Sequence, residues 1–229
     1  MEDFLTRTRI LLGEEKLNKI INSKIVVFGV GGVGSYSLEA IVRAGVGEVI
    51  LIDYDTINIT NLNRQLIATM DTIDEYKVNS AEDRIKKINP NIKVTVYPEK
   101  VGEDNVSKYI PLDTDYVIDA IDDINGKRAI IKYCVENNIR IISSMGTGNR
   151  TFFKDYIIAD ISKTNGCPLA RKLRKKLKED LIYKGVQVLF SPVQPDINVS
   201  DKIIASISFV PAQGGLKLAE KVINDIINN

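Results

Sequence analysis

The stretch KIVVFGVGGVGS, residues 24–35, decides the fold. Residues 24–28 form an apolar run typical of a buried strand, and residues 35–44 have the spacing of a helix. The glycines between them allow a tight turn and let the backbone approach phosphate closely. They are Gly29, Gly31, Gly32 and Gly34. A glycine-rich turn that opens a helix predicts a nucleotide site, because free N–H groups of the helix face an anion.

An acidic residue follows at the spacing that such a site needs. Residues 48–52 indicate a second buried strand, and Asp53 comes directly after it, nineteen positions beyond Gly34. A carboxylate at this position holds a ribose hydroxyl in dinucleotide-binding folds. The turn is also compatible with simple packing of a helix on a strand, but the glycines and Asp53 together favour the nucleotide site. This fingerprint alone does not separate ATP from NAD or FAD.

Strand and helix patterns alternate along the chain. Helices are expected over residues 35–44, 77–88, 127–137, 168–181 and 212–227. Strands are expected over residues 24–28, 48–52, 92–96, 116–119, 140–143, 157–161, 186–190 and 203–209, with a flexible loop at 192–202. The alternation predicts an α/β, Rossmann-like fold with a mostly parallel sheet flanked by helices. We expect one domain over residues 1–229, with a nucleotide-binding core at about 1–145 and a C-terminal strand and helix extension at about 146–229.

The composition excludes several kinds of chemistry. The chain has 229 residues, no histidine, two cysteines and a formal net charge of +1. The lack of histidine removes the commonest general base and metal ligand, and two cysteines cannot form a four-cysteine site, so we expect no zinc. The small net charge provides no global attraction to nucleic acid or membrane. The charged N-terminus and the lack of a long apolar run predict no transmembrane segment and a cytoplasmic location.

A dense polar segment, IDYDTINITNLNRQL at residues 52–66, follows the second strand. Ligands of open α/β sheets lie at such carboxyl ends of strands. The expected nucleotide contacts are Asp53, Asp55, Asn61, Asn63, Arg64, Gln65 and Lys77. The cations Arg64 and Lys77 match a triphosphate and the charge that develops as pyrophosphate leaves, which favours ATP over NAD. The alternative is a solvated polar loop.

Carboxylates gather after the expected strand at residues 116–119. One carboxylate suffices for Mg²⁺, which keeps several waters and also binds phosphate oxygens. We therefore expect Asp122 to be the magnesium ligand and Asp119 to line the pocket. Asp123 is also placed to cap the helix that follows.

A basic helix is expected at LARKLRKKLKEDL, residues 169–181. Its leucines share one face at i, i+4 spacing and are Leu169, Leu173, Leu177 and Leu181. Its cations are Arg171, Lys172, Arg174, Lys175, Lys176 and Lys178. Such a cluster is a candidate surface for nucleic-acid phosphates. A solvated amphipathic helix and a helix on a membrane surface are the alternatives.

The motifs together resemble the E1-like adenylyltransferase superfamily of ThiF, MoeB, HesA and the ubiquitin-activating enzymes. Those that carry the resemblance are GVGGVG (29–34), DYDTINITNLNRQ (53–65), Lys77 and AIDD (120–123). Within the superfamily, the chain is most similar to the tRNA threonylcarbamoyladenosine dehydratases. The segments that match them are FLTRTRILLGEE (4–15), ADISKTNGCPLARKLRKKL (159–177) and SISFVPAQGG (206–215).

The resemblance implies a homodimeric, Mg·ATP-dependent enzyme and assigns roles by motif position. Gly32 approaches the phosphates, Asp53 holds the ribose, and Arg64 and Lys77 hold phosphates. Asp122 binds magnesium. Arg7 occupies the place of an arginine that reaches into the partner's site; on its own it is compatible with a solvated helix face.

The resemblance further implies adenylylation of the carboxylate of threonylcarbamoyladenosine in tRNA, followed by ring closure. It places tRNA on the basic helix and is compatible with a sulfur-acceptor or cysteine-desulfurase-type partner. The first alternative is an adenylyltransferase that activates the C-terminus of a ubiquitin-like sulfur carrier. An NAD-dependent oxidoreductase and a non-catalytic nucleotide sensor or scaffold are the others.

The two cysteines bear on this choice. Relatives that activate sulfur carriers generally have two CxxC pairs for zinc, and this chain has none. Cys167 lies roughly where thioester-forming relatives have a catalytic cysteine, but it immediately precedes Pro168, which suits the entry to a helix. We expect a structural Cys167 and a Cys134 buried in the core.

Overall fold

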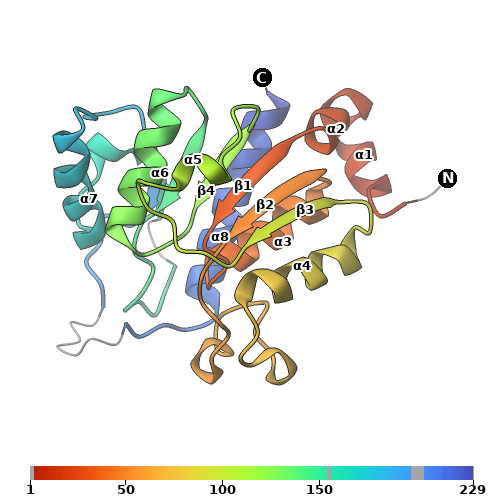
Figure 1. Ribbon diagram of the computed structural model, residues 1–229, viewed down its shortest axis with the longest axis horizontal. Coiled ribbons are helices and arrows are strands. Elements are labelled where there is room, and N and C mark those ends of the chain that lie inside the picture. Colours follow the sequence, from red (N-terminus) through yellow and green to blue (C-terminus); the bar gives the residue numbers. More distant parts are fainter. Residues whose placement is uncertain (1–2, 154–155, 197–203, 229) are drawn as a thin grey trace.

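Seven strands form one sheet in the described residues, which are 3–153, 156–196 and 204–228 of the computed structural model (Figure 1). The strands are β1 (Lys24–Phe28), β2 (Glu48–Ile52), β3 (Lys93–Tyr97), β4 (Tyr116–Asp119), β5 (Ile141–Ser144), β6 (Ile157–Asp160) and β7 (Gln187–Phe190). The α-helices are α1 (Thr6–Leu12), α2 (Glu14–Ile21), α3 (Gly34–Ala44), α4 (Lys77–Ile88), α5 (Val106–Tyr109), α6 (Ile124–Glu136), α7 (Pro168–Glu179) and α8 (Phe209–Ile227). Short 3₁₀ turns cover Ile59–Asn61, Met70–Thr72 and Ile161–Lys163. None of these helices is long and apolar enough to cross a membrane.

The order of the strands creates a reversal in the middle of the sheet. The order is β3-β2-β1-β4-β5-β7-β6, and all neighbours are parallel except β6 and β7. The chain moves outward from β1 to β3 and then returns to β4 on the other side of β1. Ligands of open α/β sheets bind at the carboxyl ends of the strands beside such a reversal. The predicted Rossmann-like fold is confirmed, and the C-terminal part adds β6 and β7 to the same sheet.

Helices cover both faces of the sheet, so the central strands are buried on each side (Figure 1). In β1, Ile25 and Val27 pack into a core with α2, α3, α4 and α8. Val26 and Phe28 point to the opposite face and pack with α5, α6 and α7. This two-sided burial explains why β1 has a continuous apolar run instead of an alternating pattern.

Several expected elements have different ends. Helix α6 begins at Ile124 rather than 127, because the Asp123 carboxylate accepts a hydrogen bond from the Gly126 N–H at 2.7 Å and caps the helix. Helix α7 ends at Glu179, and Leu181 has a φ of 62°, which an α-helix cannot include. Helices α1, α2 and α5 were not expected from the sequence.

The prediction of a strand at residues 203–209 is wrong. Residues 204–207 belong to no strand, Phe209 begins α8, and Ile203 lies outside the described residues. The segment runs beside a loop instead of a sheet edge: Ala205 exchanges two hydrogen bonds with Asn149, at 2.7 and 2.8 Å. β-branched residues gave the segment a strand-like pattern, but its described part pairs with Asn149 and not with a strand of the sheet. In the loop expected at 192–202, only residues 192–196 are described, and they form no helix or strand.

Candidate active site

A cavity of about 460 Å³ opens at the carboxyl ends of β1, β2 and β4, where the strand order reverses. It brings together most of the site residues expected from the sequence. Those that line it are Gly29, Gly31, Gly32, Asp53, Asp55, Asn61, Arg64, Gln65, Lys77 and Asp122. Gly34, Asn63, Asp119 and Arg7 do not line it. The sequence therefore predicted one wall of the cavity well, whereas Gly34, Asn63 and Asp119 lie outside it; Arg7 was expected in the partner's site and stays a prediction.

The glycine turn lies against neighbouring backbone, which explains its composition. Gly29 has a φ of +81°, and an added Cβ would lie 2.9 Å from the Ala120 carbonyl oxygen. A Cβ on Gly34 would lie 1.7 Å from the Gly29 carbonyl oxygen, so Gly34 packs the turn onto α3 instead of facing the cavity. Gly31 and Gly32 remain at the cavity wall. The backbone is thus open to a phosphate at these two positions.

Asp53 holds the glycine turn as well as facing the cavity. One carboxylate oxygen accepts the Val30 N–H at 2.9 Å, and the other accepts the Asp55 N–H at 3.0 Å. The side chain is buried, and this burial raises the pKa of Asp53. Each carboxylate oxygen can accept a further hydrogen bond, so the group can hold the turn and a ribose hydroxyl together.

Two cations lie on the same side of the cavity. The buried Lys77 ammonium contacts the Asp55 carboxylate at 2.6 Å. The Arg64 guanidinium donates to the Thr60 carbonyl and to the Asn63 side chain, both at 2.9 Å. Asn63 is therefore a support for Arg64 instead of a wall of the cavity. Both cations are held in place before any anion binds, which lowers the cost of ordering them.

The side-chain oxygen of Gln65 is a buried acceptor with no hydrogen-bond partner among the described residues. Gln65 lines the cavity, and its amide lies 3.6 Å from the position of an added Cβ on Gly31. A buried polar atom without a partner costs free energy that a ligand can recover. This unsatisfied acceptor is consistent with a polar ligand beside the glycine turn.

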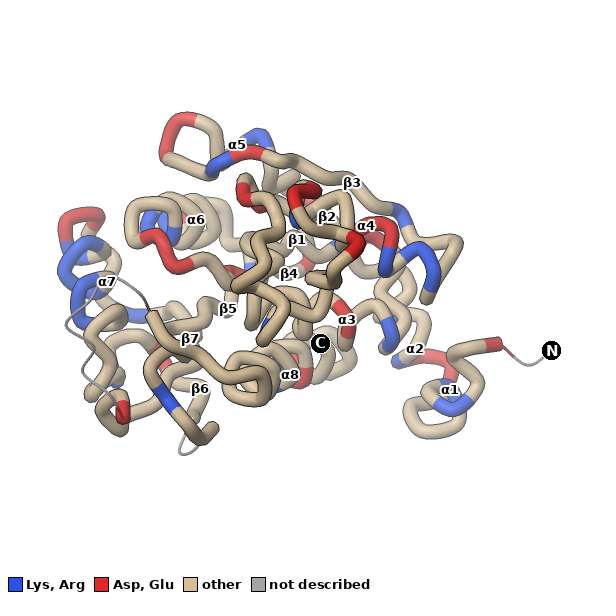
Figure 2. Tube along the Cα trace, turned by 90° about the horizontal axis from the view of Figure 1, so that it is seen from below, with Lys and Arg blue, Asp and Glu red and all other residues tan. Residues whose placement is uncertain are grey.

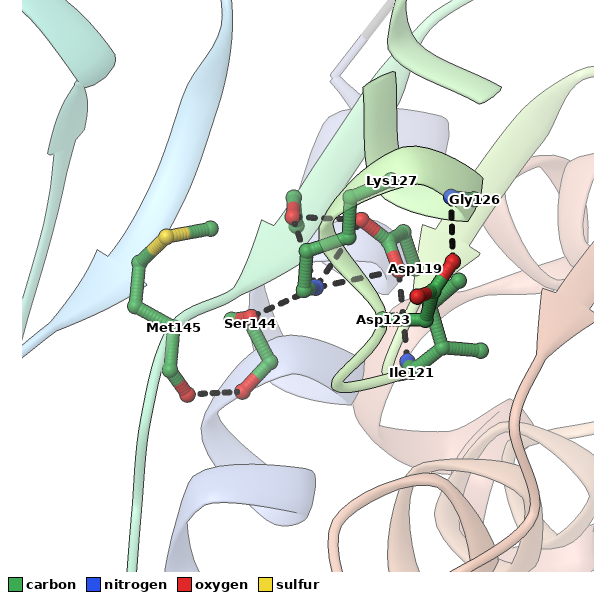
Figure 3. A network of polar contacts seen from close by, with 8 residues as sticks. Asp119, Ile121, Asp123, Gly126, Lys127, Ser144 and Met145 are labelled. Atoms are coloured by element: carbon green, nitrogen blue, oxygen red, sulfur yellow. Dashed lines mark hydrogen bonds and ion pairs between the residues drawn. The ribbon is translucent and has the colours of Figure 1, made fainter. Parts of the chain in front are cut away.

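The aspartates Asp119, Asp122 and Asp123, at and after the end of β4, have three different environments; Figure 3 shows Asp119 and Asp123. Asp119 is fully buried and pairs with Lys127, so the expectation that it lines the pocket is wrong. Asp119 pairs in register with Phe28 of β1, and residues in register point to the same face of a sheet. Because Phe28 packs on the face that α6 covers, the Asp119 side chain points to that face and away from the cavity. Asp123 caps α6, as the alternative interpretation had it. Asp122 is exposed, lines the cavity and makes no hydrogen bond or ion pair with the described residues.

Asp122 is thus the carboxylate best placed to meet a metal ion. The described residues contain no group of three or more Asp, Glu, Cys or His side chains that could hold a metal by themselves. The donor set nevertheless fits Mg²⁺ that arrives with a nucleotide, since this ion takes one or two carboxylates together with phosphate oxygens and water.

Several residues of the cavity were not assigned to the site from the sequence. They are Tyr54, Glu99, Lys100, Val101, Ser144, Met145, Gly146, Thr147, Gly148, Leu169, Ile204, Ser206 and Pro211. Most of them come from loops after β3 and β5 and from the C-terminal part of the chain. Lys127 was also missed, although a lysine on the apolar face of α6 is a detectable anomaly.

Both cysteines are buried, and neither lines the main cavity. Cys134 lies in the core beneath α6, where burial raises the pKa of its thiol. Cys167 precedes Pro168 at the entry to α7, as expected for a structural residue. It lines a separate cavity of about 130 Å³.

Helix α7 presents a row of cations to solvent (Figure 2). Leu173 and Leu177 are buried against the domain, whereas Leu181 lies beyond the helix and is 75% exposed, so it does not extend the apolar face as expected. The exposed cations are Arg171, Lys172, Lys175 and Lys178. Arg174 instead donates to the Thr164 carbonyl at 2.6 Å. Because Leu169 lines the main cavity, the exposed row begins at its rim.

The fold and the cavity define a Rossmann-like nucleotide-binding protein, and the chain belongs to the ThiF family, which it matches over residues 5–228. A tRNA threonylcarbamoyladenosine dehydratase of Bacillus subtilis (strain 168) is 38% identical over 240 residues, covering 98% of this chain and 94% of that protein. The crystal structure of the E. coli dehydratase TcdA with AMP has a TM-score of 0.91 and 34% identity, covering 97% of this chain and 93% of that one. The same E. coli protein has also been solved with ATP, with a TM-score of 0.89. A Candida albicans adenylyltransferase and sulfurtransferase is 38% identical, over 56% of this chain and 29% of its own length.

Proposed function

We propose that this chain is an ATP-dependent dehydratase of the ligase class that acts on N6-threonylcarbamoyladenosine in tRNA. The arrangement of the cavity carries the proposal: two fixed cations and one carboxylate without a protein partner surround the glycine turn. Such a set suits a reaction in which pyrophosphate leaves. The near full-length similarity to dehydratases supports the tRNA nucleoside as substrate, in preference to a sulfur-carrier protein.

In this proposal the wall of the cavity formed by β1 and β2 binds ATP. Gly31 and Gly32 offer backbone N–H groups to phosphate, and Asp53 accepts a ribose hydroxyl. Arg64 and Lys77 neutralise the phosphates. Asp122, on the facing turn, would hold Mg²⁺, which stabilises the charge on the leaving pyrophosphate.

The proposed chemistry needs no nucleophile from the protein. A carboxylate oxygen of the substrate attacks the α-phosphorus of ATP, and pyrophosphate leaves. The ureido oxygen of the same side chain then attacks the activated carbonyl carbon, the ureido nitrogen loses a proton, and AMP departs with the former carboxylate oxygen. Attack within one molecule has a high effective molarity, so positioning replaces covalent catalysis. A chain without histidine and with both cysteines outside the cavity is consistent with this route.

The decisive experiment gives the protein ATP, Mg²⁺ and tRNA that carries threonylcarbamoyladenosine. We expect the nucleoside recovered under mild conditions to have lost one water, in the wild type and equally in Cys167→Ser. Mass spectrometry of the nucleoside and the release of AMP measure this. If the nucleoside is unchanged while the wild type adenylylates a protein that ends in Gly-Gly, the chain is a sulfur-carrier activator instead.

The exposed cations of α7 are proposed to contact the tRNA backbone. We expect Lys172→Gln/Lys175→Gln to raise the KM for tRNA several-fold and to lower the slope of log affinity against log salt by about two, one for each phosphate that the variant no longer neutralises. The kcat at saturating tRNA should stay unchanged. Steady-state kinetics at a series of salt concentrations measure both quantities.

The matched control is Lys86→Gln/Lys87→Gln, because these lysines are equally exposed but lie on α4, on the other face of the sheet. It removes the same charge from the protein and should leave the KM and the salt slope as in the wild type. Equal effects of the two double variants would show that only net charge matters, and α7 would then have no specific role.

We further propose a cytoplasmic homodimer in which Arg7 serves the partner's site. Arg7 is exposed on α1, which packs on α2 at the periphery of the molecule and does not reach the cavity of its own subunit (Figure 1). We expect Arg7→Ala and Asp122→Ala each to be inactive, and a mixture of the two to recover activity, since a mixed dimer keeps one intact site. Recovery is measured after subunit exchange has been verified by mass. No recovery would place Arg7 outside catalysis or within its own subunit's site.

A further inference from the structure

Lys127 is the most deeply buried cation of the described chain, with no exposed surface. Its ammonium donates to both oxygens of Asp119 at 3.1 and 3.0 Å, to the Ser143 hydroxyl at 3.2 Å and to the Ser144 carbonyl at 2.8 Å (Figure 3). Four acceptors surround three protons, so every N–H of the ammonium has a partner. Lys127 can touch neither the nucleotide nor the acceptor, and any effect on them must pass through these contacts.

Stability alone is a poor reason to keep such a pair. The desolvation of two charges offsets most of their attraction, and a well-packed apolar pair of similar volume is often as stable. The ion pair forms directional hydrogen bonds between particular atoms, and these hold the atoms in fixed relative positions. An apolar pair forms no such bonds. Asp119 and Ser143 are neighbours in register at the ends of β4 and β5, and the Ser143 hydroxyl donates to Asp119 at 2.6 Å. Lys127 adds to this pairing a tie from Asp119 to the carbonyl of Ser144, the last residue of β5.

Both segments that leave this junction line the cavity. On one side Asp119 accepts the Ile121 N–H at 3.2 Å, which shapes the turn that carries Asp122. On the other side the Ser144 carbonyl is fixed by Lys127, and the loop of residues 145–148 continues from it along the cavity wall. Residues 120–123 and 144–148 therefore depend on a common anchor, and we call them the acceptor half of the cavity.

The nucleotide half has separate anchors. Asp53 holds the glycine turn through Val30, and Lys77 is paired with Asp55. In the sheet this half lies on β1 and β2, and the acceptor half lies on β4 and β5. If ATP binds to the first half, as in the proposed function, the acceptor carboxylate would approach from the second half, which lines the same cavity.

We propose that Lys127 is a positioning residue for the acyl-transfer steps. It sets the place of Asp122 relative to the loop of residues 145–148, and it contributes little to nucleotide binding. The proposal rests on the proposed function for its chemistry, but its structural content, a shared anchor for the acceptor half, is independent of the substrate.

The test uses the full-length double variant Asp119→Asn/Lys127→Met. The single variant Lys127→Met leaves Asp119 buried without its partner and is expected to unfold. The double variant carries no charge at these two positions, and the asparagine oxygen can still accept from Ile121, so the feature that it removes is the link from residue 127 to Ser143 and Ser144. The matched control is Glu39→Gln/Arg84→Met, which neutralises a partly exposed pair, at 2.7 Å between α3 and α4, on the opposite face of the sheet.

Three measurements are made on the folded double variant. Amide hydrogen exchange should speed up by about tenfold or more in residues 120–123 and 144–148, and stay as in the wild type at Val30 and Asp55, whose N–H groups Asp53 holds. The Kd for AMP without metal should remain within about threefold of the wild type, whereas kcat falls by about 100-fold, the cost of a displacement of about 1 Å. The control should change none of these values.

Each result decides the proposal. Faster exchange confined to the acceptor half, with a reduced kcat and unchanged AMP binding, supports it. Exchange that rises equally throughout the sheet, AMP binding that falls in step with kcat, or a kcat within about threefold of the wild type overturns it. If the wild-type protein does not dehydrate the tRNA nucleoside, the proposed function fails, and the exchange pattern with AMP binding still decides the role of Lys127.

Discussion

Replacing Asp122 by asparagine is expected to lower kcat by about 1,000-fold and to leave the Kd for AMP unchanged. Asp122 lines the cavity, is exposed and has no protein partner in the described chain, so its carboxylate is free to neutralise charge on the metal–pyrophosphate group. AMP lacks that group and does not need Asp122. Single-turnover kinetics and calorimetry with AMP measure the two effects.

The neighbouring carboxylate provides the control. Asp123 caps α6 through Gly126, and asparagine caps a helix about as well as aspartate does. Asp123→Asn should therefore keep both stability and kcat. If the Asp122 variant keeps its kcat and the Asp123 variant loses it, the roles of the two residues are exchanged and the metal site lies one residue further along.

Lys77→Met is expected to weaken ATP binding by about 100-fold and AMP binding by no more than about threefold, because a charge-assisted hydrogen bond to phosphate is removed in the first case only. The fold should tolerate the change, since the Asp55 carboxylate left behind is 46% exposed and stays hydrated. Calorimetric titration with ATP and AMP in the absence of acceptor separates the two affinities.

Lys100→Met is the matched control for Lys77. Lys100 also lines the cavity, but its ammonium lies over the Tyr54 ring at 5.5 Å from the centroid and is exposed. Its replacement should affect ATP and AMP alike and weakly. If Lys77→Met reduces both affinities equally, the lysine supports the cavity wall through Asp55 and does not distinguish a triphosphate from a monophosphate.

The part of the site that the sequence predicts is the part encoded locally. Strand β1, the glycine turn and α3 follow one another, and the positive φ of Gly29 and the contact of Gly34 with Gly29 are set within a few positions. Asp53 to Lys77 follow the next strand, so their common edge was predictable from the parallel order of the strands alone. Arg7 stays a prediction, since its expected partner is a second subunit.

The remainder depends on contacts between distant segments. Ser206 and Pro211 reach the cavity from the C-terminal part, and no local pattern shows that they cross to it. Asp119 was assigned to the correct strand but to the wrong side, because the strand alone does not reveal which face its last residue takes. The face is decided by the pairing of Asp119 with Phe28, and this register between two strands cannot be read from the sequence. The strand expected at 203–209 was wrong for a related reason, since a strand also needs a partner strand, and the described part of this segment pairs with Asn149 instead.

Asp53 limits how the nucleotide preference of this protein can be redesigned. The same carboxylate that we propose to hold the ribose accepts the N–H groups of Val30 and Asp55 and so keeps the glycine turn in place. A substitution of Asp53 that is meant to admit a modified sugar also removes the hydrogen bonds that hold the glycine turn. Selection for the new ligand would then start from a turn without this support. Productive libraries would keep Asp53 and vary the rim instead, at Tyr54, Glu99 and Lys100, where side chains line the cavity without supporting its backbone.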